Sequence, residues 1–120
     1  MGAVRDLLNI RAKNRSRLQK EAPVLYESFD EMLKRVYQEG AISLKNKELM
    51  AVAASVATRC VPCLANHASN AVAAGATRAE VLEAAGIGVE FGGGPSFIVI
   101  RDNLLEFLDE IMAERDGESA

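Results

Sequence analysis

The sequence is poor in the side chains that usually carry chemistry, with no Trp, two Cys and one His among its 120 residues. It also lacks a basic excess, since 14 Lys and Arg stand against 17 Asp and Glu for a net charge of −3. A dedicated nucleic-acid binder usually carries a basic balance or a basic patch. We therefore expect no nucleic-acid partner.

A long hydrophobic run is missing as well. The longest nearly apolar stretch, residues 49–57, is far shorter than the ~20 residues that cross a bilayer. The first twenty residues hold six basic side chains and no apolar centre of the kind found in secretion signals. We expect a cytoplasmic protein without a membrane partner, and in that compartment paired cysteines are more often catalytic or metal-binding than structural.

What the chain does have is apolar material at helical spacing. Hydrophobic residues make up 49% of the sequence, and strand alternation is not sustained anywhere. In a chain of single-domain length, this predicts an all-α bundle of about six helices, with residues 1–120 forming one domain.

Several residues predict where the helices begin and end. Pro23 is well placed to begin the second helix, and Gly40 to end it. Ser43 is the expected N-cap of the third helix. Thr77, with Glu80 three residues later, has the spacing of a capping box for the fifth helix.

The glycines of the second half are interpreted structurally. Gly86 and Gly88 fall inside the fifth expected helix, where each costs about 1 kcal/mol, so we interpret them as points of close helix approach or subunit contact. The row Gly92–Gly94 fits neither phosphate-binding glycine pattern, and we expect it to break the helix.

The sixth expected helix, which begins at Pro95, carries more apolar surface than one buried face requires. We predict that the surplus packs against another copy of the chain in a homo-oligomer. The surplus side chains are Phe97, Ile98, Val99, Leu105 and Met112.

Both cysteines and the histidine lie within eight residues, in the stretch CVPCLANH from Cys60 to His67. Pro62 indicates a helix start, where unpaired N–H groups and the positive end of the helix dipole favour thiolates. The two residues between Cys60 and Cys63 allow a reversible disulfide. His67 lies one turn after Cys63 on the same face, where it can accept a proton from a thiol or pass one to a leaving oxygen.

Glu48 is the fourth candidate and lies at the edge of the apolar face of the third helix. A short turn joins this helix to the fourth, so we expect the two to be antiparallel neighbours. The Glu48 carboxylate could then reach the far ring nitrogen of His67 and fix its tautomer. The spacing alone does not establish that contact.

The region around these residues resembles the AhpD-like group of the carboxymuconolactone decarboxylase family. The matching pattern is Glu48, then Cys60-x-x-Cys63, then three residues and His67, followed by AAGAT and an acidic fifth helix. The later FGGGPSFI is similar to the Gly-Gly-Pro turn of that family. The resemblance covers about residues 25–112.

The resemblance implies an all-α fold assembled as trimers or hexamers, with thiol-dependent peroxidase or disulfide-reductase chemistry. Carried over, it implies that Cys63 attacks the peroxide, Cys60 resolves the sulfenate as a disulfide, and His67 and Glu48 form a proton relay. Pro62 departs from the family pattern, since some members have His or Tyr there, and it leaves the relay with a single histidine. The decarboxylase branch generally lacks the CxxC motif, so that activity is not expected.

We therefore predict a hydroperoxide substrate, a dithiol reductant such as a lipoyl or thioredoxin-like protein, and neither a cofactor nor a metal. Two alternatives stay open. The dithiol could serve as a disulfide reductase or redox relay without peroxide. Alternatively, Cys60, Cys63, His67 and Glu48 could be the ligands of a zinc-bound scaffold, although structural zinc usually draws its second ligand pair from another tight motif.

Overall fold

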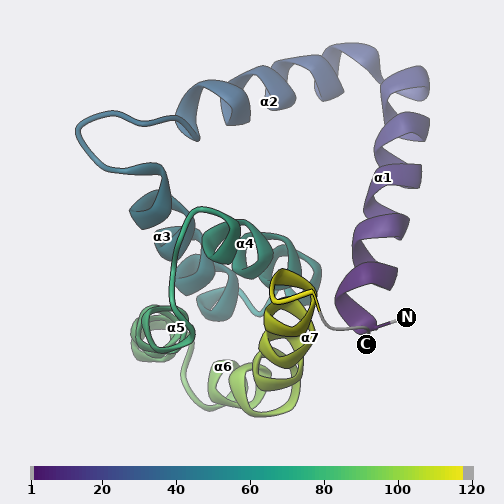
Figure 1. The fold of residues 1–120 in the computed structure, drawn as a ribbon. Helices are drawn as coiled ribbons and strands as arrows, with labels where there is room; N and C mark the ends of the chain where they lie inside the picture. The colour runs from purple at the N-terminus through teal and green to yellow at the C-terminus, as the bar shows by residue number, and fades with distance from the viewer. Residues whose placement is uncertain (1, 118–120) are drawn as a thin grey trace.

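The computed structural model describes residues 2–117, and every regular element among them is helical (Figure 1). The order is α1 (Ala3–Glu21), α2 (Pro23–Val36), α3 (Leu44–Ala57), α4 (Val61–Ala73), α5 (Arg78–Gly92), α6 (Gly94–Val99), the π-helical turn η1 (Ile100–Leu104) and α7 (Leu105–Arg115). Elements α6, η1 and α7 follow one another without a break and together form the predicted sixth helix. The predicted all-α fold is thus confirmed. No helix in this part of the chain has both the length and the apolar character that a bilayer crossing needs.

The core lies where α3, α4, α5 and α7 meet, in the compact lower part of Figure 1. Helix α4 is central, because Leu64, Ala65 and Ala68 on it are fully buried. Its small alanines let neighbouring helices approach, and α3 packs directly alongside. The facing side chains from the other elements are Val52, Val56, Val81, Ala85, Leu104, Phe107, Leu108 and Ile111.

Helices α3 and α5 approach each other closely at Gly88. A Cβ at this position would collide with the carbonyl oxygen of Ala53 and with the side chain of Val56. Gly86, on the same helix, has open space around it. The predicted close approach is therefore confirmed at Gly88, whereas within one chain it does not account for Gly86.

Helices α1 and α2 form an arm that packs against α4 and α7 at the start of α1 and otherwise stands away from this bundle (Figure 1). No residue of α2 is buried, and its apolar side chains Leu25, Phe29, Met32 and Val36 stay exposed within the single chain. The start of α1 is held by α7: the N–H groups of Val4 and Arg5 each donate to a carboxylate oxygen of Glu110 at 2.9 Å. Because the first N–H groups of a helix have no partner within it, Glu110 acts as a cap supplied by another helix.

Three helix starts agree with the sequence. Pro23 is the first residue of α2, and the Ser43 side chain accepts a backbone N–H bond at the start of α3. Thr77 and Glu80 form both hydrogen bonds of the capping box. These contacts satisfy N–H groups that a first helical turn leaves unpaired.

The predicted end of the second helix is wrong, because α2 ends at Val36 and not at Gly40. The ammonium group of Lys47, on α3, donates to the carbonyl oxygens of Val36 and Gln38 at 2.8 Å each. A lysine near a helix C-terminus can satisfy carbonyl groups that a further turn would otherwise bond. The helix end is therefore decided by a residue from the next helix.

Candidate active site

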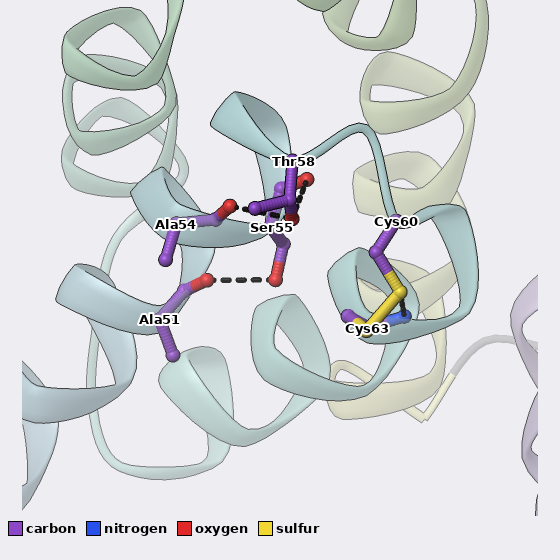
Figure 2. The surroundings of a disulfide bond; sticks show 6 residues. All are labelled: Ala51, Ala54, Ser55, Thr58, Cys60 and Cys63. Atoms are coloured by element: carbon purple, nitrogen blue, oxygen red, sulfur yellow. Dashed lines mark hydrogen bonds between the residues drawn. A yellow bond between two sulfur atoms is a disulfide. The ribbon is translucent and has the colours of Figure 1, made fainter. Parts of the chain in front are cut away.

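Cys60 is placed by the end of one helix and the start of the next (Figure 2). After α3 ends, Arg59 adopts a left-handed backbone conformation with a φ of 57°. The Arg59 N–H donates to the carbonyl oxygen of Val56 at 3.1 Å, and the Cys60 N–H donates to that of Ser55 at 2.9 Å. These are the two bonds of a Schellman motif. Because Cys60 is also the N-cap of α4, backbone hydrogen bonds fix its position from both sides.

Cys60 and Cys63 form a disulfide at the first turn of α4 (Figure 2). Their Cα atoms are 5.2 Å apart, and the Cys63 N–H donates to Cys60 Sγ at 3.3 Å. The sulfurs thus lie at a helix start, as predicted, and this environment favours a thiolate after reduction. The two cysteines differ in access, since Cys63 is exposed and Cys60 is half-buried.

His67 and Glu48 form a direct pair between α4 and α3. The Nδ1 atom of His67 lies 2.7 Å from Oε1 of Glu48. The Glu48 side chain is only 7% exposed and that of His67 is 20% exposed, and a buried carboxylate requires a partner of this kind. The contact that the sequence left open is therefore present. It leaves Nε2 as the ring nitrogen that can serve a reacting group.

Tyr37 is a neighbour of the site that the sequence reasoning missed. Its ring stacks on the His67 imidazole, with the centroids 5.4 Å apart and an interplanar angle of 24°. Burial, and after it the Glu48 carboxylate, raise the pKa of Tyr37 above its ordinary value. Lys47 holds this end of α2 in place through the two carbonyl bonds described above. In the sequence, Tyr37 falls at helical spacing after Phe29 and Leu33, and no local pattern marks it as the partner of a distant histidine.

Cys63 and His67 open onto one cavity of about 520 Å³ between α1, α2 and the first turns of α4. Apolar side chains of the arm, including Leu18, Leu25 and Phe29, form much of its wall. Cys60 and Glu48 lie outside the lining. The exposed sulfur of Cys63 and the imidazole of His67 therefore face the same cavity, whereas the residues bonded to them, Cys60 and Glu48, do not line it.

The zinc alternative gains no support from this geometry. The sulfurs of Cys60 and Cys63 are bonded to each other. Across residues 2–117, no group of three or more His, Cys, Asp or Glu side chains is placed to hold a metal ion.

Comparison with known proteins gives the family. Residues 23–101 match the model of the carboxymuconolactone decarboxylase family. Because this match spans more than half of the sequence, the chain belongs to the carboxymuconolactone decarboxylase family. The resemblance inferred from the Glu, CxxC and His pattern is thereby confirmed.

Two curated relatives are themselves uncharacterised. A protein from Cupriavidus necator is 37% identical over 73 residues, which is 61% of this chain and 65% of that protein. The chain thus spans slightly less than two thirds of that relative. The uncharacterized protein 4 in the cox locus of Paracoccus denitrificans is 32% identical over 85 residues, which is 71% of this chain and 76% of that protein.

Solved structures share the fold over almost their whole length. A carboxymuconolactone decarboxylase family protein from Legionella pneumophila has a TM-score of 0.80 and 32% identity, covering 88% of this chain and 95% of that one. A family protein from Thermotoga maritima, described as possibly involved in antioxidative response, has a TM-score of 0.82 and 25% identity, covering 95% and 97%.

Proposed function

We propose that this protein is a thiol-dependent peroxidase that reduces organic hydroperoxides through a dithiol–disulfide cycle. The observation that carries the proposal is the shared cavity. The exposed Cys63 and the partly buried His67 open onto one largely apolar space, and Oε1 of Glu48 lies 2.7 Å from Nδ1 of the imidazole. A nucleophile, a proton carrier and an orienting carboxylate are the parts that such a reaction needs. The description of the Thermotoga maritima relative supports the same class of chemistry.

The first half of the cycle takes place at Cys63. Its thiolate attacks the outer oxygen of a hydroperoxide ROOH, so that an S–O bond forms and the O–O bond breaks. His67 passes a proton to the leaving alkoxide, which departs as the alcohol ROH, and Cys63 is left as a sulfenic acid. Glu48 stabilises the imidazolium that supplies this proton.

The second half of the cycle forms the disulfide. The sulfur of Cys60 attacks Cys63 Sγ, and the departing hydroxide combines with the proton released by Cys60 to give water. Two electrons have then passed from the cysteine pair to the peroxide. A dithiol such as a lipoyl group or a thioredoxin-like protein restores the thiols by exchange, with exposed Cys63 as the sulfur that it reaches first. Because this cycle depends on reducing partners, we place the protein in the cytoplasm.

The test follows free thiols in the reduced protein after removal of the reductant. About one equivalent of cumene hydroperoxide should remove two thiols per chain, with one peroxide consumed for each pair lost. Cys63→Ser should abolish this loss, and His67→Ala should slow it by about 10²-fold, as expected when a general acid is removed. Cys60→Ser is the matched control, because it should still consume peroxide but stop at the sulfenic acid. If the thiols do not react with peroxide but exchange readily with oxidised lipoamide, the peroxidase proposal is wrong and a disulfide reductase is favoured.

We further propose that the protein works as a homo-oligomer, a trimer or a hexamer. The apolar surface of α6 supports this, because Phe97 and Ile98 on it are 56% and 45% exposed. Monomeric proteins rarely leave several large apolar side chains together in water. Sedimentation equilibrium should give a multiple of the chain mass, and Phe97→Asp should lower it. A wild-type monomer at micromolar concentration would refute this proposal.

A further inference from the structure

The cavity beside Cys63 is larger than a peroxide group requires. Its volume of about 520 Å³ falls in the range of pockets that enclose a drug-sized molecule. Leu25, Phe29 and Leu33 line it from α2, and Leu18 lines it from α1. The reacting group of a substrate at Cys63 would therefore sit at one place on a surface that also accepts an extended apolar chain.

The polar part of the lining has one positive charge in excess. The lining contains two guanidinium groups, Arg11 and Arg15, and one carboxylate, Asp30. Arg15 is already engaged, because its Nη2 lies 2.6 Å from Oδ1 of Asp30 and 2.9 Å from the hydroxyl of Tyr26. The second carboxylate oxygen of Asp30 lies 3.0 Å from the ammonium of Lys34. The carboxylate is thus shared between two cations, neither of which is Arg11.

Arg11 has no carboxylate within ion-pair distance anywhere in residues 2–117. Arg11 is exposed as a whole residue, but desolvation by nearby atoms, and after it the neighbouring guanidinium of Arg15, lowers its pKa. The charge of Asp30 acts on Arg11 in the opposite direction, but it does not outweigh these two effects. An anion in the cavity would offset them, because it would pair with a guanidinium that has no carboxylate within ion-pair distance. Guanidinium groups also bind carboxylates in a bidentate geometry.

We propose that the cavity binds an amphipathic anion, a hydroperoxide of a long-chain carboxylic acid, with its carboxylate on Arg11 and its chain on the apolar wall of α1 and α2. The inference rests on the proposed function for the fate of the peroxide group, which is reduced at Cys63 to the alcohol while the carboxylate takes no part. The anion site itself rests only on the cavity and its charges. Arg11 thus determines substrate specificity and does not take part in the chemistry.

The test compares a fatty-acid hydroperoxide with its methyl ester, which has the same chain and peroxide but no charge. Below their micelle concentrations, the wild type should show a kcat/KM for the acid about tenfold above that for the ester, as expected for a hydrogen-bonded charge. Arg11→Met should bring this ratio close to one, and Arg11→Glu should invert it. Lys13→Ala, which removes a charge from an exposed position of α1 outside the cavity, should leave the ratio unchanged.

A second measurement separates this inference from the peroxidase itself. The oxidised protein should bind the corresponding hydroxy fatty acid in calorimetry, and Arg11→Met should weaken that binding by about tenfold. If the protein binds the hydroxy fatty acid but turns over neither hydroperoxide, the peroxidase proposal is refuted and the anion site is supported. Equal turnover of acid and ester, with no binding of the hydroxy acid, would overturn the anion site and leave the peroxidase standing. The same result is expected if a second copy of the chain fills the cavity, so it counts against the proposal.

Discussion

The bundle of α3–α7 and the arm of α1 and α2 are built from the same kind of amphipathic helix, but they bury it differently. In the bundle, Leu64, Val52 and Leu108 are completely buried. In the arm, Val4 is the buried residue of α1, and the α2 side chains Leu25 and Phe29 are 63% and 56% exposed. A helical hydrophobic pattern thus specifies a helix and an apolar face, but it does not specify what covers that face.

The candidate active site is formed by both regions, the bundle and the arm. Cys60, Cys63, His67 and Glu48 all belong to α3 and α4 or the turn between them, where packing and backbone hydrogen bonds fix their positions. The cavity wall that faces Cys63 comes from the arm. In the function proposed above, the bundle carries the reacting residues, and the less tightly packed arm supplies the surface on which a substrate would bind.

The largest effect should separate the two regions by stability. Leu64→Ala removes a fully buried side chain and should lower the free energy of unfolding by about 2–5 kcal/mol. Leu25→Ala changes an exposed residue and should cost less than ~0.5 kcal/mol. Urea titration of both variants measures the difference. A cost at Leu25 that approaches the cost at Leu64 would mean that an assembly buries the arm as firmly as the bundle buries its core.

Inside the bundle, the two glycines of α5 offer a matched pair. Gly88→Ala introduces a Cβ against Ala53 and Val56 and should destabilise the protein by about 1–3 kcal/mol. Gly86→Ala meets no atom within 4 Å and should stabilise it by up to ~1 kcal/mol, because alanine is the better helix former. Thermal unfolding of the two variants measures whether each substitution raises or lowers the stability. A destabilising Gly86→Ala would indicate a neighbour supplied by another subunit.

The contact between arm and bundle at Tyr37 should have a smaller effect. Tyr37→Leu removes a stacked ring, a contact worth about 0.5–1.5 kcal/mol, and should slow peroxide-dependent thiol loss by roughly 2–10-fold. Tyr37→Phe keeps the ring and should stay within about twofold of the wild type. Since His67 is the single histidine of the chain, its NMR ring signals report the stacking independently of activity. Those signals should move in the Leu variant and stay in the Phe variant.

The smallest effect should appear at alkaline pH. The pKa of Tyr37 is raised in the folded protein, so above the usual tyrosine pKa of about 10 the folded state holds a proton that the unfolded state has lost. Stability must then fall as the pH rises through that range. Tyr37→Phe lacks the titrating group and should lose less stability between pH 9 and pH 11, as measured by urea unfolding at each pH. Parallel curves for the two proteins would contradict the raised pKa of Tyr37.

The residues that the sequence predicted correctly are those whose neighbours lie nearby in the chain. Cys60, Cys63 and His67 follow from one helix start and one helical turn, and Ser43 and Thr77 follow from capping within three residues. Glu48 needed the additional inference that α3 and α4 are antiparallel, and the 2.7 Å contact with His67 is present. Their catalytic roles remain predictions that the experiments above can decide.

The features that the sequence did not predict depend on side chains that meet across helices. The end of α2 is set by Lys47 from α3, and the start of α1 is capped by Glu110 from α7. In the sequence, Tyr37 looks like one more apolar residue of an amphipathic helix, and only the folded structure shows that its ring stacks on His67. Arg11 is one of many exposed charges, and only the packing of α1 beside α2 shows that it also lines the cavity. None of these pairings leaves a periodic or local signal.

Cys60 takes part in one hydrogen bond at the end of α3, through its backbone N–H, and in another at the start of α4, through its sulfur. Reduction of the disulfide changes the acceptor only in the second of these hydrogen bonds. The Cys60 N–H is bonded to the carbonyl oxygen of Ser55, which no redox step alters. The Cys63 N–H is bonded to Cys60 Sγ, an acceptor that becomes stronger when the sulfur carries a negative charge. In amide hydrogen exchange, Cys60 would therefore serve as a constant reference and Cys63 as a reporter. The oxidation state of the protein could then be followed at two neighbouring backbone amides, without a label and without consuming the thiols.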